Sequence, residues 1–261
     1  MHGKIPIRKG RHLEQMREAG RVASDILKAT AKAVEPGATT RDVEEVAIRL
    51  IEEAGCESAF HGYRNFPGHI CISLNEEVVH GIGSDRRVIQ YGDILKIDVG
   101  IVKDGWVGDN ALTVPVGEID PEVRRLLEVT EESLHVAIEH ARAGGRLGEL
   151  CHAVEKHVLG NGFSVVREYV GHGVGRKLHE EPQVPNHWNF GRDGKGVALQ
   201  EGMILAIEPM VNLGTEKTRT LADRWTVVTL DGKPSAHFEH TVLVGREGGE
   251  ILTPRPRFAG G

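Results

Sequence analysis

The feature that most constrains the fold of this chain is an internal duplication. Residues 36–55 and 143–162 each place apolar side chains at i, i+3, i+4 and i+7, the spacing of an amphipathic helix, and each reaches a glycine at its end. In the first copy, Thr39 and Asp42 have the spacing of a capping box. Each copy follows another amphipathic segment, and the second of these begins at Asp120–Pro121, a good N-cap followed by proline. The sequence therefore predicts two similar α/β halves packed about a pseudo-two-fold axis.

The strand regions repeat as well, and their polar residues coincide. The matched pairs are QYGDILKIDVG (90–100) with QEGMILAIEPM (200–210), VGDNALTV (107–114) with FEHTVLV (238–244), and VVHGIG (78–83) with VGHGVG (170–175). These alignments pair Asp98 with Glu208, Asp109 with Glu239, and His80 with His172. Two halves packed about an axis would bring all six residues to the centre, which predicts a single site.

Carboxylates at these positions require compensation by positive charge. Taken singly, Asp98 is typical of a strand end and Asp109 of a turn. Glu208 directly follows the apolar run MILAI, and Glu239 leads into the apolar TVLV, where an ionised carboxylate is costly unless it is paired or bound to metal. Four carboxylates gathered without a cation would repel one another. Four carboxylates and one imidazole suit two divalent ions at the roughly 3.5–4 Å separation of two-metal hydrolases.

Composition excludes several other classes of protein. A chain of 261 residues lies at the upper end of single-domain size. Its apolar runs are too short to span a bilayer, and MHGKIPIRKG has no signal-peptide core. A net charge of −6 disfavours nucleic-acid binding. The three cysteines lack the spacing of structural zinc and are expected to be reduced thiols. We therefore expect a cytoplasmic protein without nucleic-acid specificity or membrane contact. A monomer is a further expectation that composition does not decide.

Six stretches of the chain form an ordered set. They are MREAGRVA, FPGHICISLNEEVVHGI, GDILKIDVGIVKDGWVGDNA, YVGHGVGRKLHEEPQVPN, EGMILAIEPMVN and SAHFEHTVLV. Together they resemble the type I methionine aminopeptidases, peptidases with the pita-bread fold. The resemblance implies an α+β fold in which two pseudo-symmetric α/β halves form an antiparallel-rich curved sheet covered by helices. We expect an N-terminal arm at 1–12, a catalytic domain at 13–250 with halves at about 13–115 and 120–245, and a tail at 251–261 whose TPRPRFAGG end frays.

The resemblance also implies an activity and its cofactors. The activity is metal-dependent removal of the N-terminal methionine from nascent proteins and peptides whose second residue is small, by a metal-bridged hydroxide. The implied cofactors are two divalent ions per chain, and the donor set does not distinguish Fe²⁺, Mn²⁺, Co²⁺ and Zn²⁺. The substrate would be a nascent polypeptide or peptide, and contact with the ribosome is a further expectation.

Individual roles follow from the resemblance position by position. The implied metal ligands are Asp98, Asp109, His172, Glu208 and Glu239, with Asp109 and Glu239 shared by both ions. His80 and His179 would be catalytic histidines that do not bind metal, and Glu208 would also shuttle a proton. The substrate methionine and its peptide bond would contact Tyr63, Phe66, Cys71, His80, His179 and Trp225.

Three positions depart from the family pattern. Leu178 stands where an aromatic residue is expected, which would reshape the pocket wall. Gly83 replaces a proline after HGI, which would loosen the loop near His80. Asn110 follows Asp109 in place of threonine or serine, which would tune metal affinity.

Two other functions remain open from the sequence. A pita-bread enzyme that cleaves X-Pro bonds or creatine would normally carry a further N-terminal domain, for which about a dozen residues are present here. A non-catalytic pita-bread protein that has lost its metals would not be expected to keep all five ligand positions. The aromatic and cysteine side chains of the expected pocket favour methionine over the substrates of the first alternative.

Overall fold

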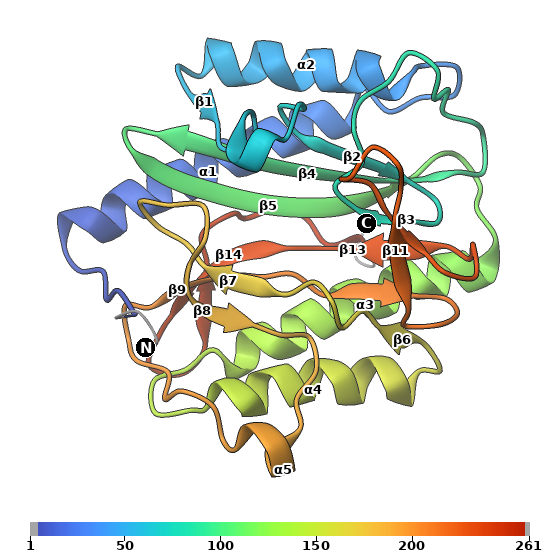
Figure 1. Cartoon of the computed structure of the whole chain (residues 1–261). Helices are drawn as coiled ribbons and strands as arrows, with labels where there is room; N and C mark the ends of the chain where they lie inside the picture. The colour runs from blue at the N-terminus through green and yellow to red at the C-terminus, as the bar shows by residue number, and fades with distance from the viewer. Residues whose placement is uncertain (1–4, 259–261) are drawn as a thin grey trace.

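Helices cover both outer faces of this protein, and antiparallel strands fill the space between them (Figure 1). The structure, a computed structural model, describes residues 5–258. The helices on one side are α1 (Arg11–Ala31) and α2 (Thr40–Glu53), and those on the other are α3 (Pro121–His140) and α4 (Leu147–Gly160). A short helix, α5 (Phe190–Asp193), lies beyond α4 in the view of Figure 1. The predicted α+β class is confirmed.

Four sheets contain the strands, and every ladder between them is antiparallel. The first has the order β1 (Glu57–Ser58), β4 (Ile94–Lys103) and β2 (Cys71–Leu74), with β5 (Trp106–Pro115) also on β4. The largest has the order β15 (Gly249–Ile251), β14 (His240–Val244), β9 (Ile204–Ile207), β7 (Gly171–Gly173) and β8 (Glu180–Val184). The other two are β13 (Ser235–His237), β10 (Met210–Asn212) and β6 (Ser164–Val165), and β11 (Thr218–Thr220), β12 (Val227–Thr229) and β3 (Glu77–Val79).

The helix ends follow from local sequence. At the start of α2, the Asp42 carboxylate accepts from Thr39 N–H at 2.7 Å, and Thr39 Oγ1 accepts from Asp42 N–H at 3.1 Å, which is the predicted capping box. Gly55 follows α2 with φ 62°, a conformation that glycine adopts without steric cost. The Asp120 carboxylate caps α3 by accepting from Glu122 N–H at 2.7 Å.

Each half has its own apolar core. In the first half, side chains such as Ile26 on α1 and Val43 on α2 pack with Ile97 on β4. In the second half, side chains of α3 and α4 pack against strand residues such as Leu205 on β9. Leu112 on β5 packs against both cores. Because burial of each such side chain contributes about 1.5–3 kcal/mol, the two cores hold the strands between them in fixed positions. Among residues 5–258, no helix combines the length and apolar character needed to cross a membrane.

The two halves join along a seam between β5 and the chain at residues 237–241. Glu239 N–H donates to Ala111 O at 2.8 Å, and Thr241 Oγ1 donates to Asp109 O at 2.7 Å. Further along, His237 N–H donates to the hydroxyl of Thr113 at 3.0 Å. The seam therefore places Asp109 of one half beside Glu239 of the other.

The expectation that the end of the chain frays is wrong for residues 253–258. Thr253 is fully buried, and the hydroxyl of Ser24 on α1 donates to Pro254 O at 2.7 Å. The Phe258 N–H donates to a Glu131 carboxylate oxygen at 2.6 Å. Residues 1–4 of the expected arm and 259–261 of the tail lie outside the described residues. The boundaries of the expected domain and of its halves stay predictions.

Candidate metal centre and active site

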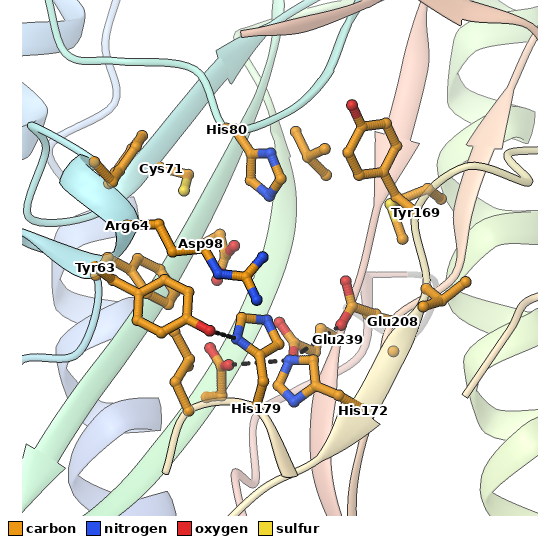
Figure 2. A pocket seen from close by; sticks show the side chains of 18 of the residues that line it. Tyr63, Arg64, Cys71, His80, Asp98, Tyr169, His172, His179, Glu208 and Glu239 are labelled. Atoms are coloured by element: carbon orange, nitrogen blue, oxygen red, sulfur yellow. Dashed lines mark hydrogen bonds and ion pairs between the residues drawn. The ribbon is translucent and has the colours of Figure 1, made fainter. Parts of the chain in front are cut away.

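One cavity of about 520 Å³ opens where the two halves meet. Its walls include every residue to which the sequence assigned a site role: Tyr63, Phe66, Cys71, His80, Asp98, Asp109, His172, His179, Glu208, Glu239 and Trp225. Figure 2 shows the labelled side chains converging on the cavity from strands, loops and a short helical turn of both halves. The duplicated segments thus contribute to a single site.

Strands of both halves position the acidic residues and His172. Asp98 lies on β4 and Asp109 on β5, while Glu208 directly follows β9 and Glu239 directly precedes β14. One ligand atom each from Asp109, His172 and Glu239 lies within 4.8 Å of the other two, and no other group of three such residues occurs in the part of the chain that the structure describes. His172 Nε2 lies 3.5 Å from a Glu208 oxygen and 3.8 Å from an Asp109 oxygen.

The orientation of the His172 ring makes Nε2 the nitrogen that faces these acids. Its Nδ1 lies 3.0 Å from Gly173 O. A carbonyl oxygen only accepts, so Nδ1 carries the proton and donates, which leaves the lone pair on Nε2. Burial and then the neighbouring His179 lower the pKa of His172 to about 3. His172 is therefore neutral at physiological pH, the state in which imidazole binds metal.

Burial and mutual repulsion disfavour ionisation of the four acids. Burial raises the pKa of Asp109 to about 7. Burial and the Asp109 charge raise the pKa of Asp98 well above its ordinary value. Burial raises the pKa of Glu208 and of Glu239 in the same way, with Asp109 as the largest charged contributor to each. A cation bound among these acids would stabilise their ionised forms, and it would therefore offset the rise in pKa caused by burial and by mutual repulsion.

The residues present fit a divalent-metal site. Three buried carboxylate oxygens, namely Asp98 Oδ1, Asp109 Oδ1 and Glu239 Oε1, have no hydrogen-bond partner in the structure. A buried ionised carboxylate without a partner is costly, and carboxylate oxygens together with a neutral imidazole nitrogen are common ligands of divalent transition metals. The donor chemistry and the unpartnered oxygens therefore both indicate a site for a divalent metal ion.

The two remaining histidines of the site differ in exposure. His179 lies at the exposed side of the cavity, with its ring centroid 4.2 Å from that of His172 and its Nδ1 2.8 Å from Tyr63 Oη (Figure 2). Burial and then the Arg64 charge lower the pKa of His179. His80 follows β3 with φ 61°, and its ring makes edge-to-face contacts with the rings of Tyr169 and Trp225. Burial lowers the pKa of His80 to about 4.

Comparisons with known proteins agree with this geometry. The model of metallopeptidase family M24 matches residues 14–246. The chain is 49% identical to methionine aminopeptidase 1 of Bacillus subtilis over 243 residues, 93% of this chain and 96% of that protein. The chain belongs to the type I methionine aminopeptidases.

Solved structures extend this assignment to the fold. The methionine aminopeptidase of Thermotoga maritima superposes with a TM-score of 0.93 at 43% identity, covering 97% of this chain and 100% of that one. The prolidase of Pyrococcus horikoshii superposes with a TM-score of 0.78 at 23% identity, covering 97% of this chain and 64% of that one. The prolidase shows the fold alone. The predicted pita-bread fold is confirmed.

The three departures from the family pattern have different structural settings. Leu178 is buried and forms part of the cavity wall. The loop at Gly83 is held in place, because Arg41 donates to Gly83 O at 2.8 Å. The loop also packs closely, since a side chain at Gly83 would collide with the Glu44 carboxylate. The buried Asn110 amide donates to Val99 O at 3.1 Å. Its effect on metal affinity stays a prediction.

Sequence reasoning missed several residues of the site. His237, to which the sequence assigned no role, is 2% exposed, and its Nε2 lies 3.8 Å from a Glu208 oxygen. The available signal was proximity in sequence, since His237 is two residues from Glu239, which the sequence assigned to the site. Tyr169 and Arg64 also line the cavity, and Figure 2 shows the Arg64 side chain reaching into it.

Proposed function

We propose that this chain removes the N-terminal methionine from peptides and nascent proteins whose second residue is small, with two divalent ions as cofactors. The observation that carries the proposal is the cluster of buried acids and His172 within a cavity that also has aromatic walls. Methionine aminopeptidases of 49% and 43% sequence identity match nearly the full chain, which supports the same reaction. Monomeric state, contact with the ribosome and cytoplasmic location stay predictions from the sequence.

The ions would be held by five side chains. Asp98, Asp109, His172, Glu208 and Glu239 would supply four carboxylates and one neutral imidazole, and the family resemblance implies that Asp109 and Glu239 would contact both ions. A pair of divalent ions, when bound, lowers the pKa of a water molecule and polarises the carbonyl under attack. Fe²⁺, Mn²⁺, Co²⁺ and Zn²⁺ all accept such donors, so metal supply contributes to the choice among them.

His179 would stabilise the negative charge that develops on the scissile carbonyl oxygen. Because its lowered pKa keeps the ring neutral, one nitrogen carries a proton and the other accepts. Its Nδ1 is 2.8 Å from Tyr63 Oη, and a tyrosine hydroxyl can donate there, which leaves Nε2–H for the substrate. A positioned neutral donor of this kind acts as one side of an oxyanion hole.

Two further residues would bind the scissile peptide nitrogen and deliver a proton to it. His80 packs edge to face against two aromatic rings and would contact the scissile amide nitrogen. Glu208 lies between the imidazoles of His172 and His237, at 3.5 and 3.8 Å, and would carry a proton from the attacking water to the leaving nitrogen.

The methionine side chain would occupy the aromatic part of the cavity. Phe66 and Trp225 meet edge to face with ring centroids 5.1 Å apart, and buried Cys71 lines the same cavity. An unbranched thioether packs favourably against aromatic rings. Tyr63 and His80 complete the proposed pocket.

The test is peptide cleavage by metal-stripped protein to which Mn²⁺, Fe²⁺, Co²⁺ and Zn²⁺ are returned separately. We expect release of methionine from Met-Gly and Met-Ala peptides with at least one of these ions, and no release from Met-Lys peptides. Full activity in excess chelator would contradict the role of the ions. Efficient hydrolysis of X-Pro bonds, with Met-Ala left intact, would favour the alternative peptidase.

A further inference from the structure

The chain after β15 crosses the seam between the two halves. Leu252 N–H donates to Thr241 O at 2.9 Å, and the Thr253 hydroxyl accepts from Thr241 N–H at 3.2 Å. One residue later, Pro254 O accepts from the hydroxyl of Ser24 at 2.7 Å. The segment is therefore attached both to β14 of the second half and to α1 of the first.

The Arg255 guanidinium forms hydrogen bonds with two backbone carbonyl oxygens at this seam. Nη1 donates to Glu239 O at 2.8 Å, and Nη2 donates to Ala111 O at 2.8 Å. Ala111 O also accepts from Glu239 N–H at 2.8 Å, so the guanidinium reinforces a hydrogen bond that already joins the halves. Nη1 lies 3.0 Å from His240 Nδ1, which must accept because a guanidinium only donates. A planar fork of this kind holds two oxygens at a fixed separation.

The two carbonyl groups that Arg255 contacts belong to or lie near the residues proposed to bind both ions, Glu239 and Asp109. One is the carbonyl of Glu239 itself, and the other lies two residues from Asp109 on β5. Glu239 Oε1 and Asp109 Oδ1 have no hydrogen-bond partner, so the positions of these oxygens depend on the backbone that carries them. Burial lowers the pKa of Arg255 to about 10, so the guanidinium remains positively charged at neutral pH.

We propose that Arg255 is a positioning residue that fixes the separation of the Asp109 and Glu239 carboxylates and thereby sets the affinity of the site for divalent ions. The inference rests on the proposed function, which makes both carboxylates metal ligands. Arg255 lies outside residues 14–246, the segment that matches the family model.

The experiment compares three variants of the full chain. Arg255→Gln removes the charge and one of the two donors, whereas Arg255→Lys keeps the charge but replaces the planar fork with a single ammonium. Arg257→Gln is the matched control, because it removes the same charge from an exposed position two residues away. Mn²⁺ binding to metal-stripped protein is measured by titration calorimetry, and the visible spectrum of the Co²⁺-loaded protein reports ligand geometry. Thermal unfolding without metal shows whether each variant folds.

We expect Arg255→Gln to weaken Mn²⁺ binding by about 10–100-fold, the range for groups that orient metal ligands. Arg255→Lys should show a smaller loss and an altered Co²⁺ spectrum, while Arg257→Gln should match the wild type. Wild-type affinity and spectrum in Arg255→Gln would overturn the proposal. If that variant does not fold, the same outcome in Arg255→Lys would overturn it. A wild type that binds Mn²⁺ but releases no methionine would refute the proposed reaction and leave the role of Arg255 to be decided by the binding data.

Discussion

Replacement of Asp109 by asparagine should stabilise the metal-free protein and remove most of the stabilisation that bound metal provides. Asp109 is 3% exposed, and burial raises its pKa from 3.8 to about 7. A carboxylate with a raised pKa binds protons more tightly in the folded state, so stability falls as pH rises from about 4 to 7. At about 1.36 kcal/mol per pKa unit, full ionisation above pH 7 costs on the order of 4 kcal/mol in the metal-free protein.

The assay is thermal unfolding at pH 8 in chelator and in Mn²⁺. In chelator, Asp109→Asn should unfold at a higher temperature than the wild type, because each kcal/mol moves Tm by roughly 2–4 °C for a chain of this size. In Mn²⁺ at 100 times Kd, the wild type should gain about 2.7 kcal/mol, and the variant should gain much less. Asp85→Asn, which alters an exposed carboxylate, should change neither result. A variant no more stable than the wild type in chelator would refute the reasoning from buried charge.

Three other substitutions test separate parts of the site. His179→Ala should lower kcat by roughly 10²-fold, the effect of losing an oxyanion donor, with Mn²⁺ affinity by calorimetry unchanged; loss of metal would instead make His179 a ligand. Trp225→Ala should raise KM for Met-Ala peptides by roughly 10-fold, since burial of an apolar side chain is worth about 1.5–3 kcal/mol; an unchanged KM in steady-state kinetics would remove Trp225 from the pocket. Gly83→Ala should lower the free energy of unfolding in urea by about 1–3 kcal/mol, because the added methyl meets the Glu44 carboxylate. Gly160→Ala, where nothing lies within 4 Å, is its control, and equal losses in both would contradict the packing argument.

The sequence predicted the helices and the location of the site because both leave periodic or repeated signals. The amphipathic repeat at 36–55 became α2 (Thr40–Glu53), and the capping pair at Thr39 and Asp42 marked its start. Matching QYGDILKIDVG with QEGMILAIEPM paired Asp98 with Glu208, and both line the cavity. A duplication carries three-dimensional information, since equivalent residues of two related halves meet near their common axis.

Other contacts left no local signal. Residues 253–258 have no hydrophobic periodicity and contain two prolines, so the sequence suggested a frayed end. Their order depends on partners far along the chain, such as Ser24 and Ala111 for Pro254 and Arg255. The same holds for the register across the seam, which depends on the hydrogen bond between Glu239 and Ala111. Periodicity describes one element at a time and cannot specify which distant carbonyl a side chain will reach.

The seam between the halves has a consequence for the cooperativity of unfolding. Asp98 and Asp109 belong to one half, whereas His172, Glu208 and Glu239 belong to the other. Each half has its own apolar core, and a smaller apolar cluster that includes Met16 and Leu243 joins them. Ions bound by all five residues would therefore act as a removable cross-link between two subdomains. Scanning calorimetry should show a single transition with metal and two resolved transitions in chelator, whereas a single transition in both would mean that the backbone contacts and the shared apolar cluster unite the molecule without metal.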